Sequence, residues 1–145
     1  MAERKQMEVV DTECVFPDYY PKNVPPNTAL EANGVFYRLV KHNPPTPKCF
    51  DNMYLADPKR LKRYKGVKLT YCYGTSLYTD ESSLDNAFNK FPEGVGDRFV
   101  AKGELFPCDG KMLKTGAPDT THYTVWLVEN HKVHKHFSCI RGLSK

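Results

Sequence analysis

The sequence VFYRLV, residues 35–40, is the first stretch of the chain with a clear structural preference. Its aromatic and β-branched residues follow a glycine, which is typical of a β-strand. Alternation along a strand places Arg38 on the same face as Phe36 and Val40. Because burying an unpaired charge is costly, we expect Arg38 to meet a ligand phosphate or a carboxylate of the protein, or to lie at an exposed edge.

Signals for short helices follow this strand. Thr46 and Asp57 each precede a proline, which is favoured at the first position of a helix. We expect one short helix that ends near Tyr54 and then one or two basic helical turns that end at Gly66. Residues 67–73 and 75–78 are predicted to form strand, interrupted at the intervening glycine.

The clearest helix of the sequence begins at Asp80 or Ser82 and ends before Pro92. Apolar residues recur within it at helical spacing and form one stripe. The stripe consists of Leu84, Ala87, Phe88 and Phe91. We expect it to pack on a sheet that contains residues 35–40 and 125–127, because a helix with one apolar face must cover another element.

Several strands are predicted in the last third of the chain. Residues 98–106 and 122–128 have strand composition, and the Asp-Gly pair at 109–110 predicts a hairpin turn. Residues 133–140 are expected to pair with 122–128 as a final hairpin. The order of elements predicts an α+β fold with a mostly antiparallel sheet and a few short helices.

The length of 145 residues predicts one domain. We place a single α+β domain at residues 34–145 and an extended, Pro- and Tyr-rich N-terminal arm at residues 1–33. Proline removes backbone donors and blocks helix there. The arm is expected either to lay Phe16, Tyr19 and Tyr20 on the domain or to remain partly disordered.

The five cysteines are scattered and form no C-x-x-C pair, so we predict no disulfide and a reducing, cytoplasmic compartment. They are Cys14, Cys49, Cys72, Cys108 and Cys139. The N-terminus lacks the pattern of a signal peptide, and no apolar run is long enough to cross a membrane. The formal net charge of +4 supports only weak attraction to anions.

A candidate phosphate or ribose site lies at Gly74, Thr75 and Ser76, just before the stripe helix. Glycine admits a close backbone approach, and hydroxyls and a helix N-terminus suit phosphate. An ordinary strand with a bulge at the glycine is the alternative. Glu104 could polarise a ribose hydroxyl or act as a base, or be a plain exposed strand residue. His122 follows the polar loop 119–121 and is expected to face a cleft.

Two other polar groups have both a functional and a plain structural interpretation. On a strand, His134 and His136 would share a side and could hold zinc with a third ligand, but lysines interleave with them, so we predict no metal site. A basic segment could bind nucleic acid through phosphate contacts and stacking on Tyr64, or be a solvated helix face. Its cations are Lys59, Arg60, Lys62, Arg63 and Lys65.

Five short motifs between Gly34 and Phe137 together resemble a family of small uncharacterised bacterial and phage proteins. The motifs are FYRLVK from residue 36, NPPT from 43, GTSLY from 74, AKGEL from 101 and HYTVW from 122. This resemblance implies no activity. It covers most of the predicted domain.

More distantly, a Tyr-Arg-Leu strand, a Gly-x-x-Leu-Tyr-Thr strand and an apolar helix resemble the RES-domain toxins. That resemblance implies an ADP-ribosyltransferase-like fold and degradation of NAD. It implies that Arg38 binds the dinucleotide phosphates, that Tyr78 lines the nicotinamide or ribose pocket, and that Glu104 supplies the carboxylate. The chain lacks the Gly-Arg-Trp/Phe-Asn segment of that family.

Three functions follow as hypotheses. The first is an NAD-handling enzyme, an NAD glycohydrolase or ADP-ribosyltransferase acting as a toxin or host-interaction protein, which requires Arg38, Tyr78 and Glu104 to converge on one cleft. The second is a non-enzymatic phage or mobile-element protein that binds and inhibits a host complex. The third is a nucleic-acid-binding module that uses the basic segment 59–65.

Overall fold

A computed structural model describes residues 14–117 and 121–144. One seven-stranded sheet organises them, with every neighbouring pair of strands antiparallel. Its strands are β1 (Leu30–Glu31), β2 (Gly34–Val40), β3 (Thr75–Tyr78), β4 (Arg98–Leu105), β5 (Gly110–Lys114), β6 (His122–Leu127) and β7 (Phe137–Leu143). Their order in the sheet is β1-β5-β6-β3-β2-β4-β7.

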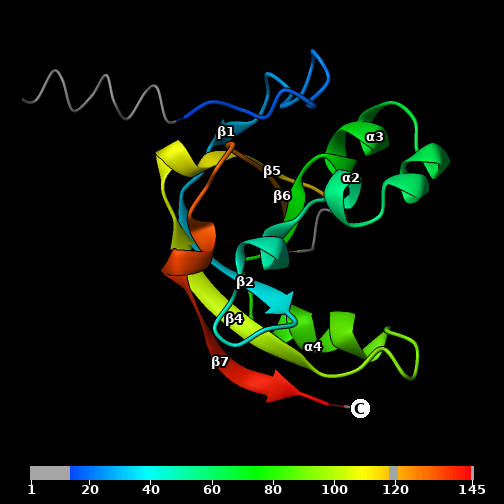
Figure 1. The fold of residues 1–145 in the computed structure, drawn as a ribbon, viewed down its shortest axis with the longest axis vertical. Helices are drawn as coiled ribbons and strands as arrows, with labels where there is room; N and C mark the ends of the chain where they lie inside the picture. The colour runs from blue at the N-terminus through cyan, green and yellow to red at the C-terminus, as the bar shows by residue number, and fades with distance from the viewer. Residues whose placement is uncertain (1–13, 118–120, 145) are drawn as a thin grey trace, which may run out of the picture.

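The helices are short and few, so the α+β class is confirmed. The α-helices are α2 (Met53–Ala56), α3 (Val67–Cys72) and α4 (Ser82–Asn89), and the 3-10 helices are η1 (Pro47–Phe50), η2 (Pro58–Arg63), η3 (Pro107–Asp109) and η4 (Val133–His136). In Figure 1, α2 and α3 lie together near β6, whereas α4 lies beside β2 and β4. Within the described ranges, no helix is long and apolar enough to span a membrane.

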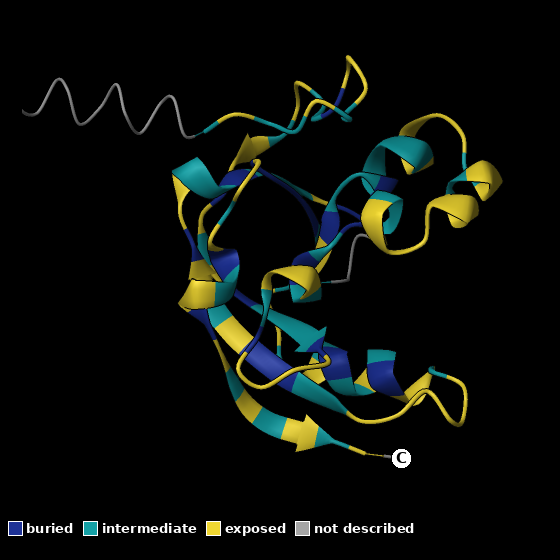
Figure 2. Cartoon of the chain, viewed as in Figure 1, coloured by how far each residue is buried: buried dark blue, intermediate teal, exposed yellow. Residues whose placement is uncertain are grey.

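The main core lies on one face of the sheet. Phe36 and Leu77 are buried there beside residues from outside the sheet, and the rings of Phe50 and Phe137 meet at 5.0 Å. Figure 2 shows buried positions concentrated on the strands and on α4. The segment from α2 to α3, residues 53–72, is mostly exposed or intermediate, and we call it the helical lobe.

The predicted stripe helix forms and is buried where expected. Leu84 is 1% exposed and Phe88 is 3% exposed, and α4 contacts β2. On the polar side of α4, Arg141 of β7 donates to Glu81 at 2.6 Å and to Asp85 at 3.0 Å. The apolar stripe and these ion pairs together hold α4 against the β2-β4-β7 part of the sheet.

The segment 67–73, predicted as strand, is instead helix α3. Gly66 has a positive φ of 61° that lets the chain turn into this helix. The indole nitrogen of Trp126, on β6, donates to the Thr70 carbonyl at 3.0 Å. At Gly74 a side chain would collide with Thr124, so glycine is required for the chain to pass close to β6. Tertiary contacts therefore override the strand-like composition.

The two predicted hairpins are also wrong. The chain leaves β4 through η3, and β5 pairs with β1 and β6 rather than with β4. Residues 133–136 form η4, and β7 pairs with β4 rather than with β6. Val133 is fully buried and Phe137 packs on Phe50, so these core contacts carry the C-terminal segment across to the other edge of the sheet.

The described part of the N-terminal arm, which begins at residue 14, lies on the domain. The Tyr19 ring stacks on Tyr54 of α2 at 4.4 Å, and the Tyr20 hydroxyl donates to the Leu127 carbonyl at 3.0 Å. The Phe16 ring packs on Tyr20. The expectation for residues 1–13 concerns a segment outside the described residues. The arm thus connects the helical lobe to β6.

A disulfide joins Cys14 in the arm to Cys108 in η3, with the two Cα atoms 5.3 Å apart. The prediction of no disulfide is therefore wrong, and the inference of a reducing compartment loses its support. Folding brings together two cysteines 94 positions apart, which spacing in the sequence does not reveal. The other three, Cys49, Cys72 and Cys139, are free thiols.

Replacing Phe88 with alanine should lower the free energy of unfolding by about 3–5 kcal/mol, because the ring is buried and would leave a cavity. Urea unfolding of the variant and the wild type measures the difference. Asn86→Ala, an exposed change on the same helix, should stay within about 0.5 kcal/mol of wild type. A Phe88→Ala cost no larger than that of the control would contradict the packing of α4.

Alkylation of the unfolded chain should label three cysteines without reductant and five after reduction, because one disulfide protects two. Reduction should also lower the free energy of unfolding by about 2–4 kcal/mol, since the cross-link closes a long loop. Mass spectrometry counts the labels. Labelling of all five without reductant would show that Cys14 and Cys108 are not joined.

Candidate functional site

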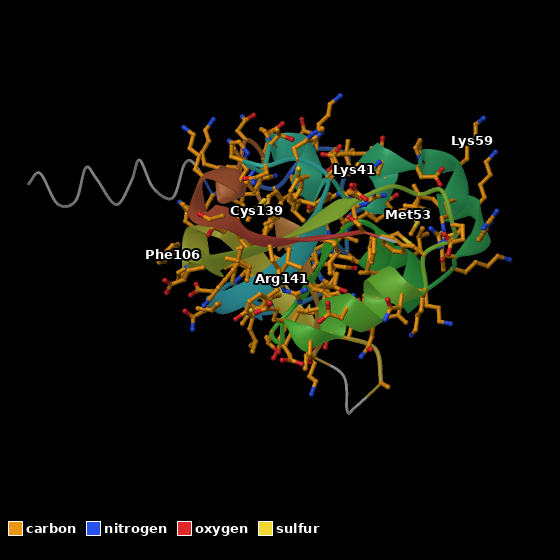
Figure 3. The ribbon with its side chains drawn as sticks, turned by 90° about the horizontal axis from the view of Figure 1, so that it is seen from below. Lys41, Met53, Lys59, Phe106, Cys139 and Arg141 are labelled. Atoms are coloured by element: carbon orange, nitrogen blue, oxygen red, sulfur yellow. A yellow bond between two sulfur atoms is a disulfide. The ribbon has the colours of Figure 1, made fainter. Side chains whose placement is uncertain are left out.

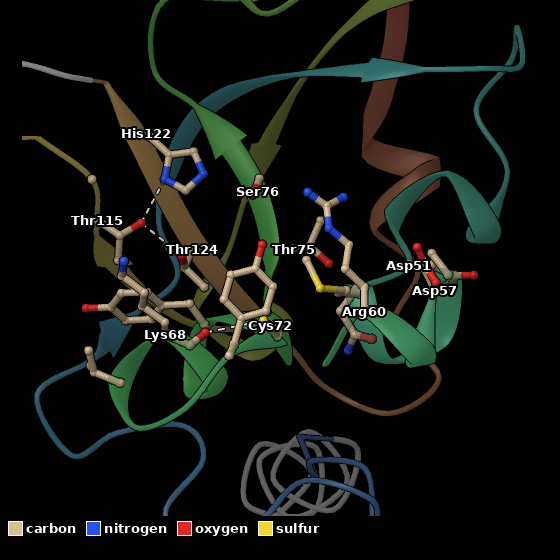
Figure 4. Close-up of a pocket in the computed structure, with 18 of the residues that line it drawn as sticks. Asp51, Asp57, Arg60, Lys68, Cys72, Thr75, Ser76, Thr115, His122 and Thr124 are labelled. Carbon is tan, nitrogen blue, oxygen red and sulfur yellow. Dashed lines mark hydrogen bonds between the residues drawn. The ribbon is translucent and has the colours of Figure 1, made fainter. Parts of the chain in front are cut away.

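A cavity of about 730 Å³ opens between the helical lobe and strands β3 and β6, and we call it the first cavity. Its lining includes Arg38, Ser76 and His122 from the strands and Lys68 and Tyr71 from α3. Figure 4 shows side chains from both the lobe and the sheet turned toward this space. The first cavity therefore joins several residues that the sequence singled out with others that it did not.

Arg38 lies where the sheet is weakest. In the described residues, β2 and β3 share a single ladder pair, Tyr37 with Tyr78. The Nε of Arg38 donates to the Cys49 carbonyl of η1, and its Nη1 donates to the Ser76 carbonyl of β3, each at 2.7 Å. Backbone carbonyls rather than a carboxylate are therefore the hydrogen-bond partners of Arg38 in the described residues.

The Arg38 guanidinium remains a cation at neutral pH. Burial lowers the pKa of Arg38 to about 10, and Cys49, Asp51 and Tyr78 oppose the change. Its planar group also faces the Phe50 ring at 5.9 Å. A guanidinium has five N–H donors, and the two backbone bonds use two of them, so Arg38 can bind an anion while it holds the strands.

The predicted Gly74–Ser76 segment lines the first cavity, but its three residues play different roles. Gly74 packs against Thr124, and the Thr75 hydroxyl is buried and donates to the Phe50 carbonyl at 2.6 Å. Ser76 is exposed and offers its hydroxyl to the cavity. Among the described residues that line the cavity, none belongs to α4, so the predicted helix N-terminus does not contribute.

His122 enters the first cavity from the start of β6. Its Nδ1 lies 2.7 Å from the Thr115 hydroxyl, which lies 2.9 Å from the Thr124 hydroxyl. Burial lowers the pKa of His122, and a hydrogen bond to the Thr115 backbone opposes part of this, so the ring is neutral at pH 7. Figure 4 shows the second ring nitrogen on the side of Ser76, free of the threonine chain.

Tyr78 and Glu104 do not line the first cavity. The Tyr78 ring packs edge-on against His122 at 5.1 Å, and burial raises its pKa while Arg38 lowers it. Glu104 is exposed on β4 opposite Val35, whereas Arg38 pairs with Ala101 three positions earlier. Alternation along the strand therefore points Glu104 and Arg38 to opposite faces. The structure does not bring Arg38, Tyr78 and Glu104 together in one cleft.

The carboxylates that do line the first cavity are Asp51, after η1, and Asp57, before η2. Burial raises the pKa of Asp51, and the nearby Lys48 and Arg38 oppose the change. Figure 4 shows both aspartates on the side of the cavity away from His122. Sequence reasoning missed them because Asp57 was interpreted only as a helix start and Asp51 falls inside a predicted short helix.

The predicted basic segment is solvent-exposed. Its cations lie on η2 and the residues just after it, and all of them are exposed. Figure 3 shows Lys59 pointing outward from the lobe, away from the sheet. Arg60 and Tyr64 are the residues of this segment that also line the first cavity. Lys68 of α3 lines the cavity as well. The sequence did not suggest it, because residues 67–73 were predicted to be a strand.

The C-terminal histidines do not share one side of a strand, because His134 and His136 lie on η4. In the described part of the chain, no group of three histidine, cysteine, aspartate or glutamate side chains is arranged to hold a metal ion. Burial, together with His134 and Lys132, lowers the pKa of His131 to about 4. The loop residues 119 and 120, which precede His122, lie outside the described residues.

Comparisons with known proteins give no assignment. No protein-family model matches the chain, and neither a curated protein nor a solved structure matches it. The resemblances to the bacterial and phage family and to RES-domain toxins therefore stay predictions.

The pKa of His122 should lie below the ordinary value of about 6.5, because burial disfavours the charged ring. The unfolded chain then takes up a proton on acidification before the folded protein does, so stability from this group is lost as the pH falls below that value. Histidine NMR titration measures the pKa. His122→Gln should reduce the loss of stability between about pH 7.5 and about pH 5.5. A pKa at or above the ordinary value would contradict the buried ring.

Proposed function

We propose that the chain binds a phosphate-bearing nucleotide, with NAD as the favoured ligand, in the first cavity. The observation that carries this proposal is the convergence of Arg38, Ser76 and His122, from three different strands, on one space with the lobe cations Arg60 and Lys68. Ligand sites are typically concave spaces of this size with a few convergent polar groups.

Positive charge at the cavity supports a phosphate ligand. The remaining donors of Arg38 can make charge-assisted bonds to phosphate oxygens, which are stronger than bonds between neutral groups. Arg60 and Lys68 are exposed at the lobe side, where they can contact phosphate without a large desolvation cost. Lysine and arginine both bind phosphate, the first as a point charge and the second through a planar fork.

The remaining lining suits the ribose and base of a nucleotide. Tyr71 offers an aromatic face, and Ser76 and Thr124 offer hydroxyls. Asp51 and Asp57 can accept hydrogen bonds from ribose hydroxyls, as acidic residues do in dinucleotide sites. A neutral ligand would not pair with the cations of the cavity, so a ligand with both a phosphate and a ribose fits best.

Hydrolysis of NAD is the reaction that we propose for this site. A water oxygen bonds to C1′ of the nicotinamide ribose while the bond from C1′ to the nicotinamide nitrogen breaks. The electron pair of that bond neutralises the ring nitrogen, and the proton of the water passes to the neutral His122. We assign the stabilisation of the developing positive charge of the sugar to Asp51, on the opposite side of the sugar from His122, because Asp51 lines the cavity and Glu104 does not.

Replacing Arg60 and Lys68 together with alanine should weaken NAD binding about tenfold or more, because each loses a charge-assisted contact. Both side chains are exposed, so the fold should be retained. Calorimetric titration with NAD measures the affinity. The Lys132→Ala, Lys135→Ala double variant, which also removes two exposed positive charges just before and on η4, is the charge-matched control. Unchanged affinity in the Arg60, Lys68 double variant would show that Arg60 and Lys68 of the lobe do not contact the ligand.

Turnover is tested with the same protein by following nicotinamide release. Asp51→Asn and His122→Gln should remove release with a smaller loss of NAD affinity than the Arg60, Lys68 double variant shows, whereas Glu104→Gln should change neither release nor affinity. Loss of release in Glu104→Gln alone would contradict this assignment. If the chain does not bind NAD but binds a single-stranded oligonucleotide with steep salt dependence, the basic segment 59–65 is the functional surface. If it binds neither ligand, the hypothesis of a non-enzymatic protein that inhibits a host complex is favoured.

A further inference from the structure

We infer that a second cavity beside Arg38 takes a terminal phosphate monoester of the same ligand, so that the preferred ligand is a dinucleotide with an additional phosphate, such as NADP. This inference rests on the proposed function, because it extends the ligand from the first cavity. The second cavity has a volume of about 420 Å³ and is lined by residues of β2, η1 and the start of β4.

The two cavities adjoin at shared residues. Arg38, Asp51 and Ala56 line both of them, so the Arg38 guanidinium lies at the boundary. A ligand that occupies both cavities must pass this group. A phosphate chain is the part of a dinucleotide best placed there, since a guanidinium binds phosphate oxygens in pairs.

The charges of the two cavities differ. Asp51 and Asp57 partly offset the three cations of the first cavity, which also carries hydroxyls. The second cavity is lined by four cations and by one carboxylate. The cations are Arg38, Lys41, Lys48 and Arg98. The excess of positive charge therefore lies in the second cavity, beyond the Arg38 guanidinium.

A terminal phosphate monoester matches this excess. Near neutral pH it carries a charge of about −1.5 to −2 and three strong acceptor oxygens, whereas a bridging phosphate carries a single charge. The Arg98 guanidinium is already positioned, because its Nη1 donates to the Asp97 carbonyl at 2.9 Å and it faces the Phe91 ring at 5.5 Å. Lys41 and Lys48 are exposed and can close on a phosphate with little rearrangement of the backbone.

The test compares NADP with NAD by calorimetric titration at one ionic strength. NADP should bind about tenfold or more tightly, because its extra phosphate gains charge-assisted bonds. The Lys41→Ala, Lys48→Ala double variant should lose this preference and keep its affinity for NAD. The Lys132→Ala, Lys135→Ala double variant, outside both cavities, should keep both affinities and controls for the loss of two charges.

The outcomes separate this inference from the proposed function. Equal affinities for NAD and NADP would overturn the inference while leaving NAD binding intact. A preference for NADP that survives in the double variant would also overturn it, since the extra phosphate would then bind elsewhere. If neither dinucleotide binds, the proposed function itself fails, and the inference fails with it.

Discussion

The guanidinium of Arg38 is the interaction on which the centre of the molecule depends. The described parts of β2 and β3 are joined by one ladder pair, and Arg38 reinforces that joint through the carbonyls of Cys49 and Ser76. Backbone carbonyls are neutral, so they satisfy the donors of a guanidinium without cancelling its charge. The group that holds the two strands and η1 together is therefore also a source of positive potential for both cavities. A carboxylate in the same place would instead offset the positive charge of the guanidinium.

The helical lobe owes its position to contacts with the arm and with β6 rather than to a core of its own. The Asn52 side chain donates to the Tyr19 hydroxyl at 3.0 Å and to the Tyr73 carbonyl at 2.8 Å, which fixes the start of α2 between the arm and β3. Trp126 holds α3 from the other side. Because the lobe forms one wall of the first cavity, the arm and β6 set the width of that cavity. The site thus depends on contacts between segments far apart in the sequence.

The periodicity of apolar residues in the sequence predicted the elements that show such a pattern clearly. The α4 stripe around Leu84 and Phe88 and the strands β2, β4 and β6 follow from periodicity, and they form where expected. Helix α3 and the pairing of β7 did not follow from it, because Trp126 and Phe137 decide them through contacts with distant partners. The same distinction applies to the site. Residue type and local position suggested Arg38, Ser76 and His122. The exclusion of Glu104 depends on the register of β2 against β4, which cannot be read directly from a single sequence.

The exposed basic segment extends to the edge of the first cavity, because Arg60 belongs to both. Its positive charges therefore add to the potential at the cavity. The other cations of the segment are fully solvated, so each contact they make is weak and depends on salt. Such charges raise the local concentration of an anion and speed its arrival, but they discriminate little between anions. The cavity, where Arg38 and His122 are partly desolvated, is where a ligand can be distinguished by shape and hydrogen bonding. The arrangement thus favours capture of an anionic ligand by the lobe and its recognition beside the sheet.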